Sequence, residues 1–106
     1  TALFDCNESH RIWQEKGLEA YKSHQRDQVK VPLQPGVAFP LVRSLLELNV
    51  VAGKNLVEVV LVSRNDSEAG ERVRHSINHH KLRITRMSFT GGTDVTQYLP
   101  AWKCDL

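Results

Sequence analysis

The sequence has few cysteines, no long hydrophobic run and no strong excess of charge of one sign. Its 106 residues include two cysteines, and 14 Lys and Arg against 12 Asp and Glu leave a net charge of +2. The longest apolar stretch, residues 57–62, is strand-sized and far shorter than the roughly 20 residues that span a bilayer. Basic residues alternate with acids instead of gathering in one patch. These shortages argue against a membrane partner and against a nucleic-acid partner.

The two cysteines lie near opposite ends of the chain, at Cys6 and Cys104. They could pair in an oxidising compartment, but two cysteines without other secretory features are more typical of reduced thiols in the cytosol. We therefore expect a cytoplasmic location. The remaining composition, 41% hydrophobic and 25% charged residues without repeats, is typical of one soluble globular domain.

The first half of the sequence predicts a short strand followed by helices. Residues 1–4 are apolar and β-prone, and residues 8–28 form a polar helical stretch that Gly17 interrupts. The large apolar side chains of this stretch do not share one narrow stripe, which predicts a pair of amphipathic helices or one broken helix. After several prolines, apolar residues at spacings of three and four over 38–49 predict the helix that faces the core.

The second half alternates between strand and helix patterns. Residues 56–62 form an almost continuous Val-rich run, which predicts a strand buried on both faces in a parallel sheet. A polar segment at 63–67 precedes a helical face that continues to His80, and a strand is predicted at 82–89. A short helical piece at 94–98 and the start of another strand at 104–106 follow. This order predicts a doubly wound α/β fold.

Three short polar segments, 5–9, 63–67 and 90–94, each follow a predicted strand. Because ligands bind beyond the carboxyl ends of the strands in such folds, we expect these segments to lie at one edge of the sheet. The second segment leads into a helix whose first amides suit a phosphate, and the Ser63 hydroxyl could add a contact. The alternative is that 63–67 only caps this helix and that Gly91 and Gly92 only form a turn.

The strings TALFDCNESH, PLQPGVAFPLV, VEVVLVSRND, GERVRHSINHHKLRITR and FTGGTDVTQYLPAWKCDL follow one another along the chain. In order, spacing and residue type they resemble the cytosolic type I 5′-nucleotidase family, over essentially the whole chain. These nucleotidases are assigned to the haloacid dehalogenase superfamily. The resemblance implies a Rossmann-like three-layer α/β sheet with a small helical cap, formed by about residues 8–30. It also implies hydrolysis of nucleoside 5′-monophosphates such as AMP, with Mg²⁺ as cofactor.

The resemblance accounts for the superfamily's catalytic carboxylates only in part. Its nucleophilic and acid/base aspartates would precede Thr1, and its acidic Mg²⁺ ligands would follow Leu106, so residues 1–106 resemble an incomplete single domain without assigned metal ligands. Asp5 is an alternative nucleophile because it follows an apolar run. However, Asn7, two residues later, cannot supply a proton as a carboxylic acid would.

The phosphate-binding groups are easier to place. Ser63 matches the superfamily's strand-end Ser or Thr that binds the transferring phosphoryl group. A lysine that family members carry after the double glycine is replaced by Pro100, and Lys103 is out of position. The candidate phosphate- and substrate-binding residues are Ser63, Arg64, Asn65, Thr90, Gly91 and Gly92.

Several other residues have simpler interpretations than a functional one. Adjacent helical positions point about 100° apart, so His79 and His80 are expected to be surface or partly buried residues and not a metal pair. His10 is expected to be solvated. Trp13 and Tyr21 are expected to be packing groups, although a small helical cap that carries them could also cover a nucleotide.

Two classes of function remain open at this point. The first is part of a Mg²⁺-dependent 5′-nucleotidase whose ligand is a nucleoside monophosphate. The second is a noncatalytic nucleotide-binding or structural half-domain that needs another segment or subunit for chemistry. The sequence leaves open whether the chain forms a homo-oligomer or lacks a second half.

Overall fold

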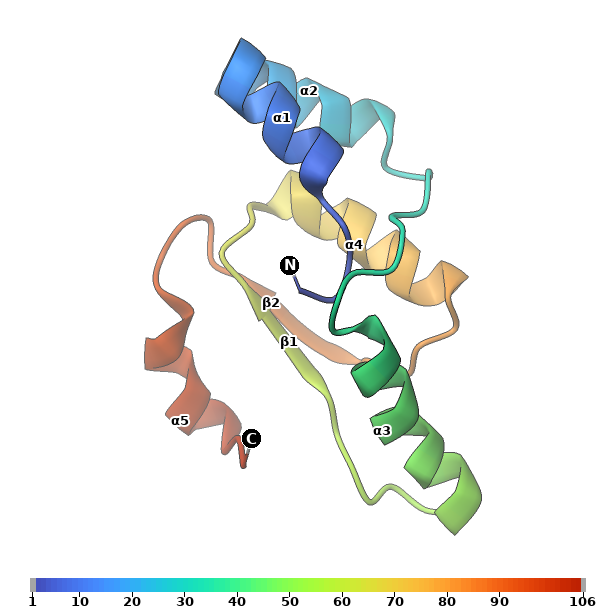
Figure 1. Cartoon of the computed structure of the whole chain (residues 1–106). Helices are drawn as coiled ribbons and strands as arrows, with labels where there is room; N and C mark the ends of the chain where they lie inside the picture. Colours follow the sequence, from blue (N-terminus) through green and yellow to red (C-terminus); the bar gives the residue numbers. More distant parts are fainter. Residues whose placement is uncertain (1, 106) are drawn as a thin grey trace.

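Two parallel strands form the sheet of the computed structural model, which describes residues 2–105. Strand β1 (Val60–Ser63) pairs with β2 (Arg86–Phe89), and the register places Val60 opposite Arg86 and Ser63 opposite Phe89. Helix α4 (Ser67–His79) connects them, as a parallel crossover requires. Figure 1 shows α4 on one side of the strands and the short α5 (Leu99–Trp102) on the other. The chain is therefore of the α/β class.

The polar N-terminal stretch forms two helices, as the sequence predicts. α1 (Asn7–Lys16) and α2 (Leu18–Asp27) pack on each other, and α2 also packs on α4. Gly17 separates them with a φ of 88°, a left-handed value that residues with a side chain rarely adopt. The helix pair lies at one end of the molecule (Figure 1).

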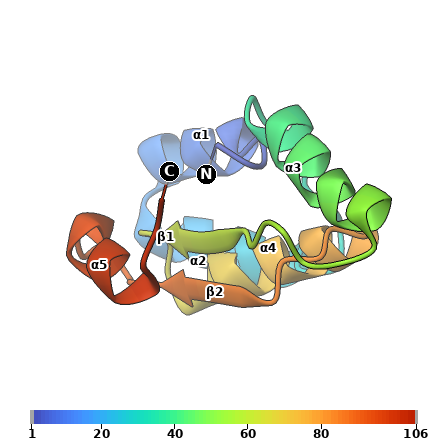
Figure 2. The ribbon, with the colours of Figure 1, turned by 90° about the horizontal axis from the view of Figure 1, so that it is seen from below.

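Helix α3 (Phe39–Ala52) is less buried than its sequence predicts. Of its residues only Phe39 and Leu46 are buried, whereas Leu41 and Val51 are 59% and 85% exposed. Figures 1 and 2 show that α3 extends past the ends of the two strands, so much of the helix has no sheet beneath it. The expectation that this helix faces the core most fully is wrong. The helix that faces the core most fully is α4, which buries six residues.

The predicted strands are shorter than expected or absent. The segment before α1 contributes a single antiparallel bridge between Phe4 and Pro35, and residues 56–59 and 82–85 lie outside the ladder. The residues of β1 before Ser63 are only half-buried, and β2 is the one strand that pairs with β1 in the described structure. A strand was predicted at residues 104–106. Cys104 and Asp105 are not in a strand, and Leu106 lies outside the described residues. Short η1 (Val95–Tyr98) confirms the helical piece at 94–98.

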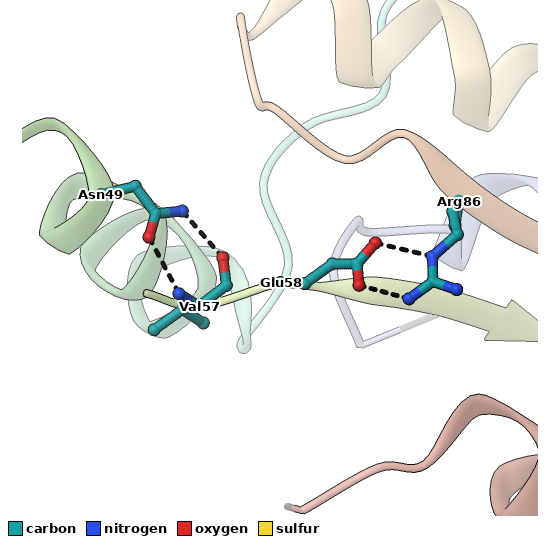
Figure 3. Close-up of polar contacts among 4 residues, drawn as sticks. All are labelled: Asn49, Val57, Glu58 and Arg86. Carbon is teal, nitrogen blue, oxygen red and sulfur yellow. Dashed lines mark hydrogen bonds and ion pairs between the residues drawn. The ribbon is translucent and has the colours of Figure 1, made fainter. Parts of the chain in front are cut away.

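Side chains hold the α3–β1 connection in place (Figure 3). The Asn49 carboxamide oxygen accepts hydrogen bonds from the amides of Leu56 and Val57 at 2.7 and 2.9 Å, and its nitrogen donates to the Val57 carbonyl at 2.8 Å. One residue further on, Glu58 forms a two-point ion pair with Arg86 of β2. The connection therefore follows a defined path although it contains no regular structure.

The core lies between α4, the first residues of α3 and the chain segments at 3–4, 33 and 82–84. Its buried apolar residues are Leu3, Phe4, Leu33, Phe39, Leu46, Val73, Ile77, Leu82 and Ile84. Gly70 of α4 lies directly on Phe89 of β2, since a Cβ at this position would come within 2.7 Å of the ring. None of the helices within residues 2–105 has the length and apolar character needed to cross a membrane.

Candidate functional site

A cleft with a volume of about 990 Å³ lies where the three predicted polar segments meet. Its walls come from the loop before α1, the loop between β1 and α4, the double glycine after β2, the turn at 35–37 and one side of α1 and α2. The lining residues are Ala2, Phe4, Asp5, Cys6, Asn7, Ser9, His10, Trp13, Leu18, Tyr21, Pro35, Gly36, Val37, Arg64, Asn65, Asp66, Gly91 and Gly92. The three segments therefore meet at one cleft, although only the second and third follow strands of the sheet, because the residues before segment 5–9 form a single bridge instead of a strand.

The loop that carries Asp5 is fixed by backbone contacts with the turn at 35–37. The Asp5 amide donates to the Gln34 carbonyl at 2.8 Å, and the Gly36 amide donates to the Leu3 carbonyl at 2.8 Å. A Cβ at Gly36 would lie 2.6 Å from the Ala2 carbonyl oxygen, so only glycine permits this approach. One Asp5 carboxylate oxygen accepts the Asn7 amide at 2.9 Å and supports the start of α1.

The loop between β1 and α4 turns sharply after the strand. Ser63 is buried, and its hydroxyl oxygen accepts the Asn65 amide at 3.2 Å. Asp66 caps α4, because its carboxylate accepts the Ala69 amide at 2.9 Å. The carboxylate of Asp66, rather than an external anion, thus satisfies one of the helix's first amides. The capping interpretation of residues 63–67 is correct for Asp66.

The loop after β2 is tied to the loop after β1. The Thr90 amide donates to the Ser63 carbonyl at 2.9 Å, and the Gly91 amide donates to the Asn65 carbonyl at 3.1 Å. In return, the Arg64 guanidinium donates to the Gly92 carbonyl from Nε at 3.4 Å and from Nη2 at 3.2 Å. Gly91 and Gly92 have φ values of 66° and 108°, which favour glycine. The two loops therefore form one cross-linked unit.

A carboxylate next to this unit is held in its charged form. One oxygen of Asp94 accepts the Thr96 amide at 2.9 Å and the Thr96 hydroxyl at 2.8 Å. The backbone bond is the largest of the causes that lower the pKa of Asp94, followed by the hydroxyl bond, and Arg64 adds a smaller attraction. Asp94 thus gives Arg64 an acidic neighbour, and Arg64 itself lines the cleft.

Of the seven residues expected to bind or react, five line the cleft: Asp5, Arg64, Asn65, Gly91 and Gly92. Ser63 and Thr90 are not among the lining residues; the Thr90 amide joins the two loops by donating to the Ser63 carbonyl, and the Ser63 hydroxyl oxygen accepts the Asn65 amide within its own loop. The Thr90 hydroxyl donates to the Thr93 carbonyl at 2.6 Å. The arrangement places one guanidinium and one carboxamide in the same cleft as the Asp5 carboxylate, and the guanidinium is the group that can attract a small anion.

Sequence reasoning missed the wall that α1 and α2 contribute. Trp13 is 48% exposed, stacks on His10 and lines the cleft, so the indole packs on a neighbouring ring and also faces the cleft. The contribution of Gly36 was also missed, although a Pro-Gly pair such as Pro35-Gly36 is a strong turn signal. Helical periodicity could not reveal the aromatic wall, because periodicity does not show which element a helix face meets.

A buried cation lies beneath the helix pair. Arg72 of α4 is 5% exposed, and its guanidinium donates to the Val31 carbonyl at 3.1 Å and to the Gln25 carboxamide at 3.2 Å. The Ser9 hydroxyl lies 3.5 Å from the same nitrogen that contacts Gln25. Burial is the main reason that the pKa of Arg72 falls below its ordinary value. Arg72 thus attaches both α1 and α2 to the scaffold.

The described residues alone do not form a Mg²⁺ site. Within residues 2–105 no group of three or more His, Cys, Asp or Glu side chains could hold a metal ion. The two cleft carboxylates, Asp5 and Asp66, each use one oxygen to accept a backbone amide. The His80 ring centroid lies 5.6 Å from that of Phe4, 5.1 Å from that of Phe39 and 5.0 Å from that of His79, and its Nε2 is 3.0 Å from the Leu33 carbonyl oxygen.

Comparison with known proteins now identifies the family. The sequence profile of the 5′-nucleotidase family matches residues 1–106. Human cytosolic 5′-nucleotidase 1B is 34% identical over 111 residues, which cover 99% of this chain but 18% of that protein. No solved structure matches the chain significantly. The chain belongs to the 5′-nucleotidase family, which confirms the resemblance of its motifs to the cytosolic type I members.

Proposed function

We propose that the cleft binds the phosphate of a nucleoside 5′-monophosphate and that the protein hydrolyses such nucleotides, AMP among them, to nucleoside and phosphate. The observation that carries this proposal is the convergence of three loops on one cleft, with Arg64, Asn65 and the double glycine on one side and Asp5 on the other. Family membership supports the reaction class. The name of the human relative supports a cytosolic location.

Arg64 supplies the positive charge for the phosphate. Its guanidinium has five N–H donors, of which two contact the Gly92 carbonyl, so the remaining donors are available to an anion. The Gly92 contact also holds the side chain in position before a ligand arrives, which reduces the entropy lost on binding. Asn65 adds a carboxamide to the cleft lining, and the Ser63 hydroxyl oxygen holds its backbone by accepting the Asn65 amide.

Asp5 is our candidate for the nucleophile among the described residues. Its carboxylate oxygen would bond to phosphorus while the phosphorus–oxygen bond to the nucleoside breaks, and water would then release phosphate and restore the carboxylate. The leaving nucleoside oxygen needs a proton, and Asn7 has no acidic proton to give. A group other than Asn7 therefore has to act as the general acid.

The proposed function also includes the type of sheet, the helical cap and the cofactor. We propose that the α/β core is part of a haloacid dehalogenase-type three-layer sheet, and that α1 and α2, within residues 8–30, form a small cap over its edge. Mg²⁺ is the cofactor that the family resemblance implies. The described residues do not fit a Mg²⁺ site by themselves, so the phosphoryl transfer to Asp5 and the release of phosphate are described by the residues of this chain alone.

Phosphate release from AMP in the presence of MgCl₂ tests this proposal. We expect Asp5→Asn to abolish turnover and Arg64→Met to weaken AMP binding, while Glu47→Gln, an equivalent change on the exposed side of α3, leaves both unchanged. EDTA should stop release if the metal is required. Turnover that survives Asp5→Asn would remove this residue as nucleophile.

The alternative function, a noncatalytic nucleotide-binding half-domain, makes a different prediction in the same experiment. The purified chain would then bind AMP in an Arg64-dependent manner without releasing phosphate. A chain that neither binds AMP nor releases phosphate would contradict both versions. The 18% coverage of the human relative is the observation that keeps this alternative in place.

A further inference from the structure

One wall of the cleft is aromatic, in contrast to its polar loops. His10 and Trp13 of α1 line the cleft together with Leu18 and Tyr21 of α2. The His10 and Trp13 rings stack with their centroids 5.8 Å apart and their planes at 24°. Trp13 is 48% exposed, so the indole does not contribute to the hydrophobic core. The pair instead presents a flat, partly apolar surface next to the candidate phosphate site.

We propose that this surface is a nucleobase-binding subsite, in which the base of a nucleoside 5′-monophosphate stacks on the Trp13 and His10 pair. This inference rests on the proposed function and adds the contact that holds the other end of the substrate. Every nucleobase has a π-face, and stacking on aromatic side chains is the main way in which proteins hold unpaired bases. An anion-binding end joined to an aromatic end matches a ligand with a phosphate at one end and a base at the other.

The spacing along α1 supports a single ligand that reaches both ends. Asn7, the first residue of α1, borders the Asp5 loop, and Trp13 follows six positions later in the same helix. At 1.5 Å of rise per residue, the two positions are about 9 Å apart along the helix axis. A nucleotide extends over a comparable distance from phosphate to base. The cleft volume of about 990 Å³ falls within the range of small-molecule sites.

Tyr21 adds a polar group to the same wall. The phenol is partly buried, and this burial is the main cause that raises its pKa above the ordinary value. The hydroxyl therefore keeps its proton at neutral pH and can donate or accept a hydrogen bond at a base edge. Gln25, which contacts both Tyr21 and Arg72, links this wall to the scaffold.

Paired titrations with AMP and ribose 5-phosphate separate the base subsite from the phosphate site. Both compounds carry the phosphate and the sugar, but only AMP carries a base. With MgCl₂ present, we expect Trp13→Ala to raise the Kd for AMP roughly 5- to 100-fold, as loss of one base stack does elsewhere, and to leave the Kd for ribose 5-phosphate within about twofold. Trp13→Phe, which keeps a stacking ring, should recover most of the AMP affinity.

Trp102 provides both a control and a fluorescence assay. It lies on α5 with its ring against Arg86, outside the cleft lining, so Trp102→Ala should leave AMP affinity unchanged. The chain has two tryptophans, and the Trp102→Phe variant therefore leaves Trp13 as the single indole. In that variant, AMP should quench the fluorescence more strongly than ribose 5-phosphate does. This fluorescence change reports on AMP binding beside an unaltered Trp13.

The outcomes distinguish the two proposals. If wild type binds both compounds and Trp13→Ala changes neither Kd, or changes both equally, the base subsite is overturned while the phosphate site stands. If wild type binds neither compound, the proposed function and the subsite are overturned together. A selective loss of AMP affinity, with Trp13→Phe close to wild type, supports the subsite.

Discussion

Arg72 allows a sharp test of what holds the cleft together. Its buried guanidinium donates to the carbonyl of Val31 and the carboxamide of Gln25, and it approaches the Ser9 hydroxyl. Arg72→Met keeps the aliphatic stem, so packing changes little, but it removes every donor. The substitution therefore isolates the polar contribution of a side chain that joins α4 to both cap helices.

The magnitude follows from the groups left behind. Two acceptors, the Val31 carbonyl and the Gln25 carboxamide, lose a donor within hydrogen-bonding distance. Gln25 is buried, and an unsatisfied buried acceptor costs about 1–3 kcal/mol; the contact to the 48% exposed Val31 is worth about 0.5–1.5 kcal/mol. Relief of the buried charge, whose cost is visible in the lowered pKa of Arg72, offsets part of this loss. We expect the free energy of unfolding to fall by about 2–4 kcal/mol, a large part of the roughly 5–15 kcal/mol typical of such a domain.

Urea denaturation followed by far-UV circular dichroism measures this change. Arg74→Met is the matched control, because Arg74 lies on the exposed side of the same helix and its ion pair with Glu71 is 3.9 Å long. Exposed pairs of this kind contribute about 0–1 kcal/mol. A second readout is AMP affinity, which should weaken for Arg72→Met because the Gln25 contact behind Tyr21 is lost. Equal stabilities for the two variants would refute the reasoning.

Three further changes test other parts of the structure. Asn49→Ala removes three hydrogen bonds between α3 and the segment before β1 and should cost about 1–3 kcal/mol in urea denaturation; an effect below about 0.5 kcal/mol would contradict this role. Gly70→Ala forces its Cβ into the Phe89 ring and should cost about 1–3 kcal/mol, part of which Phe89→Leu in the same chain should recover. The raised pKa of Tyr21 means that its stabilising contribution is complete below the unfolded value of 10.0 and is lost as pH rises through the higher folded value. Tyr21→Phe should therefore reduce the alkaline loss of stability seen in thermal melts, and an unchanged loss would contradict this role.

Local signals in the sequence predicted the helices well. Gly17 separates α1 from α2, Asp66 caps α4 and Gly53 ends α3, and each of these residues acts through its own backbone or its nearest neighbours. Strands were predicted less well because pairing depends on a partner elsewhere in the chain. Residues 56–59 have strand composition, yet the described structure pairs only the part of this run next to β2.

The candidate site shows the same division between local and non-local information. The rule that ligands bind beyond the carboxyl ends of parallel strands placed Asp5, Arg64, Asn65 and the double glycine around one cleft. The aromatic wall could not be found in this way, because Trp13 is amphipathic and its sequence position fits either a packed or an open face. Only the docking of α2 on α4 decides which face of the helix pair meets the loops.

The helices α1 and α2, which carry the aromatic wall, bury fewer side chains than the core helix α4. α1 buries only Ser9 and α2 buries only Gln25, whereas α4 buries six residues, apolar ones among them. Arg72 contacts both of these polar side chains, and an ion pair between Arg26 of α2 and Glu68 of α4 adds a second polar link to the scaffold. Segments with few buried apolar contacts open at lower free energy than the core around them. We therefore expect the wall that would hold the base to open at a lower free energy than the sheet and the phosphate loops, and Arg72→Met to lower that free energy further.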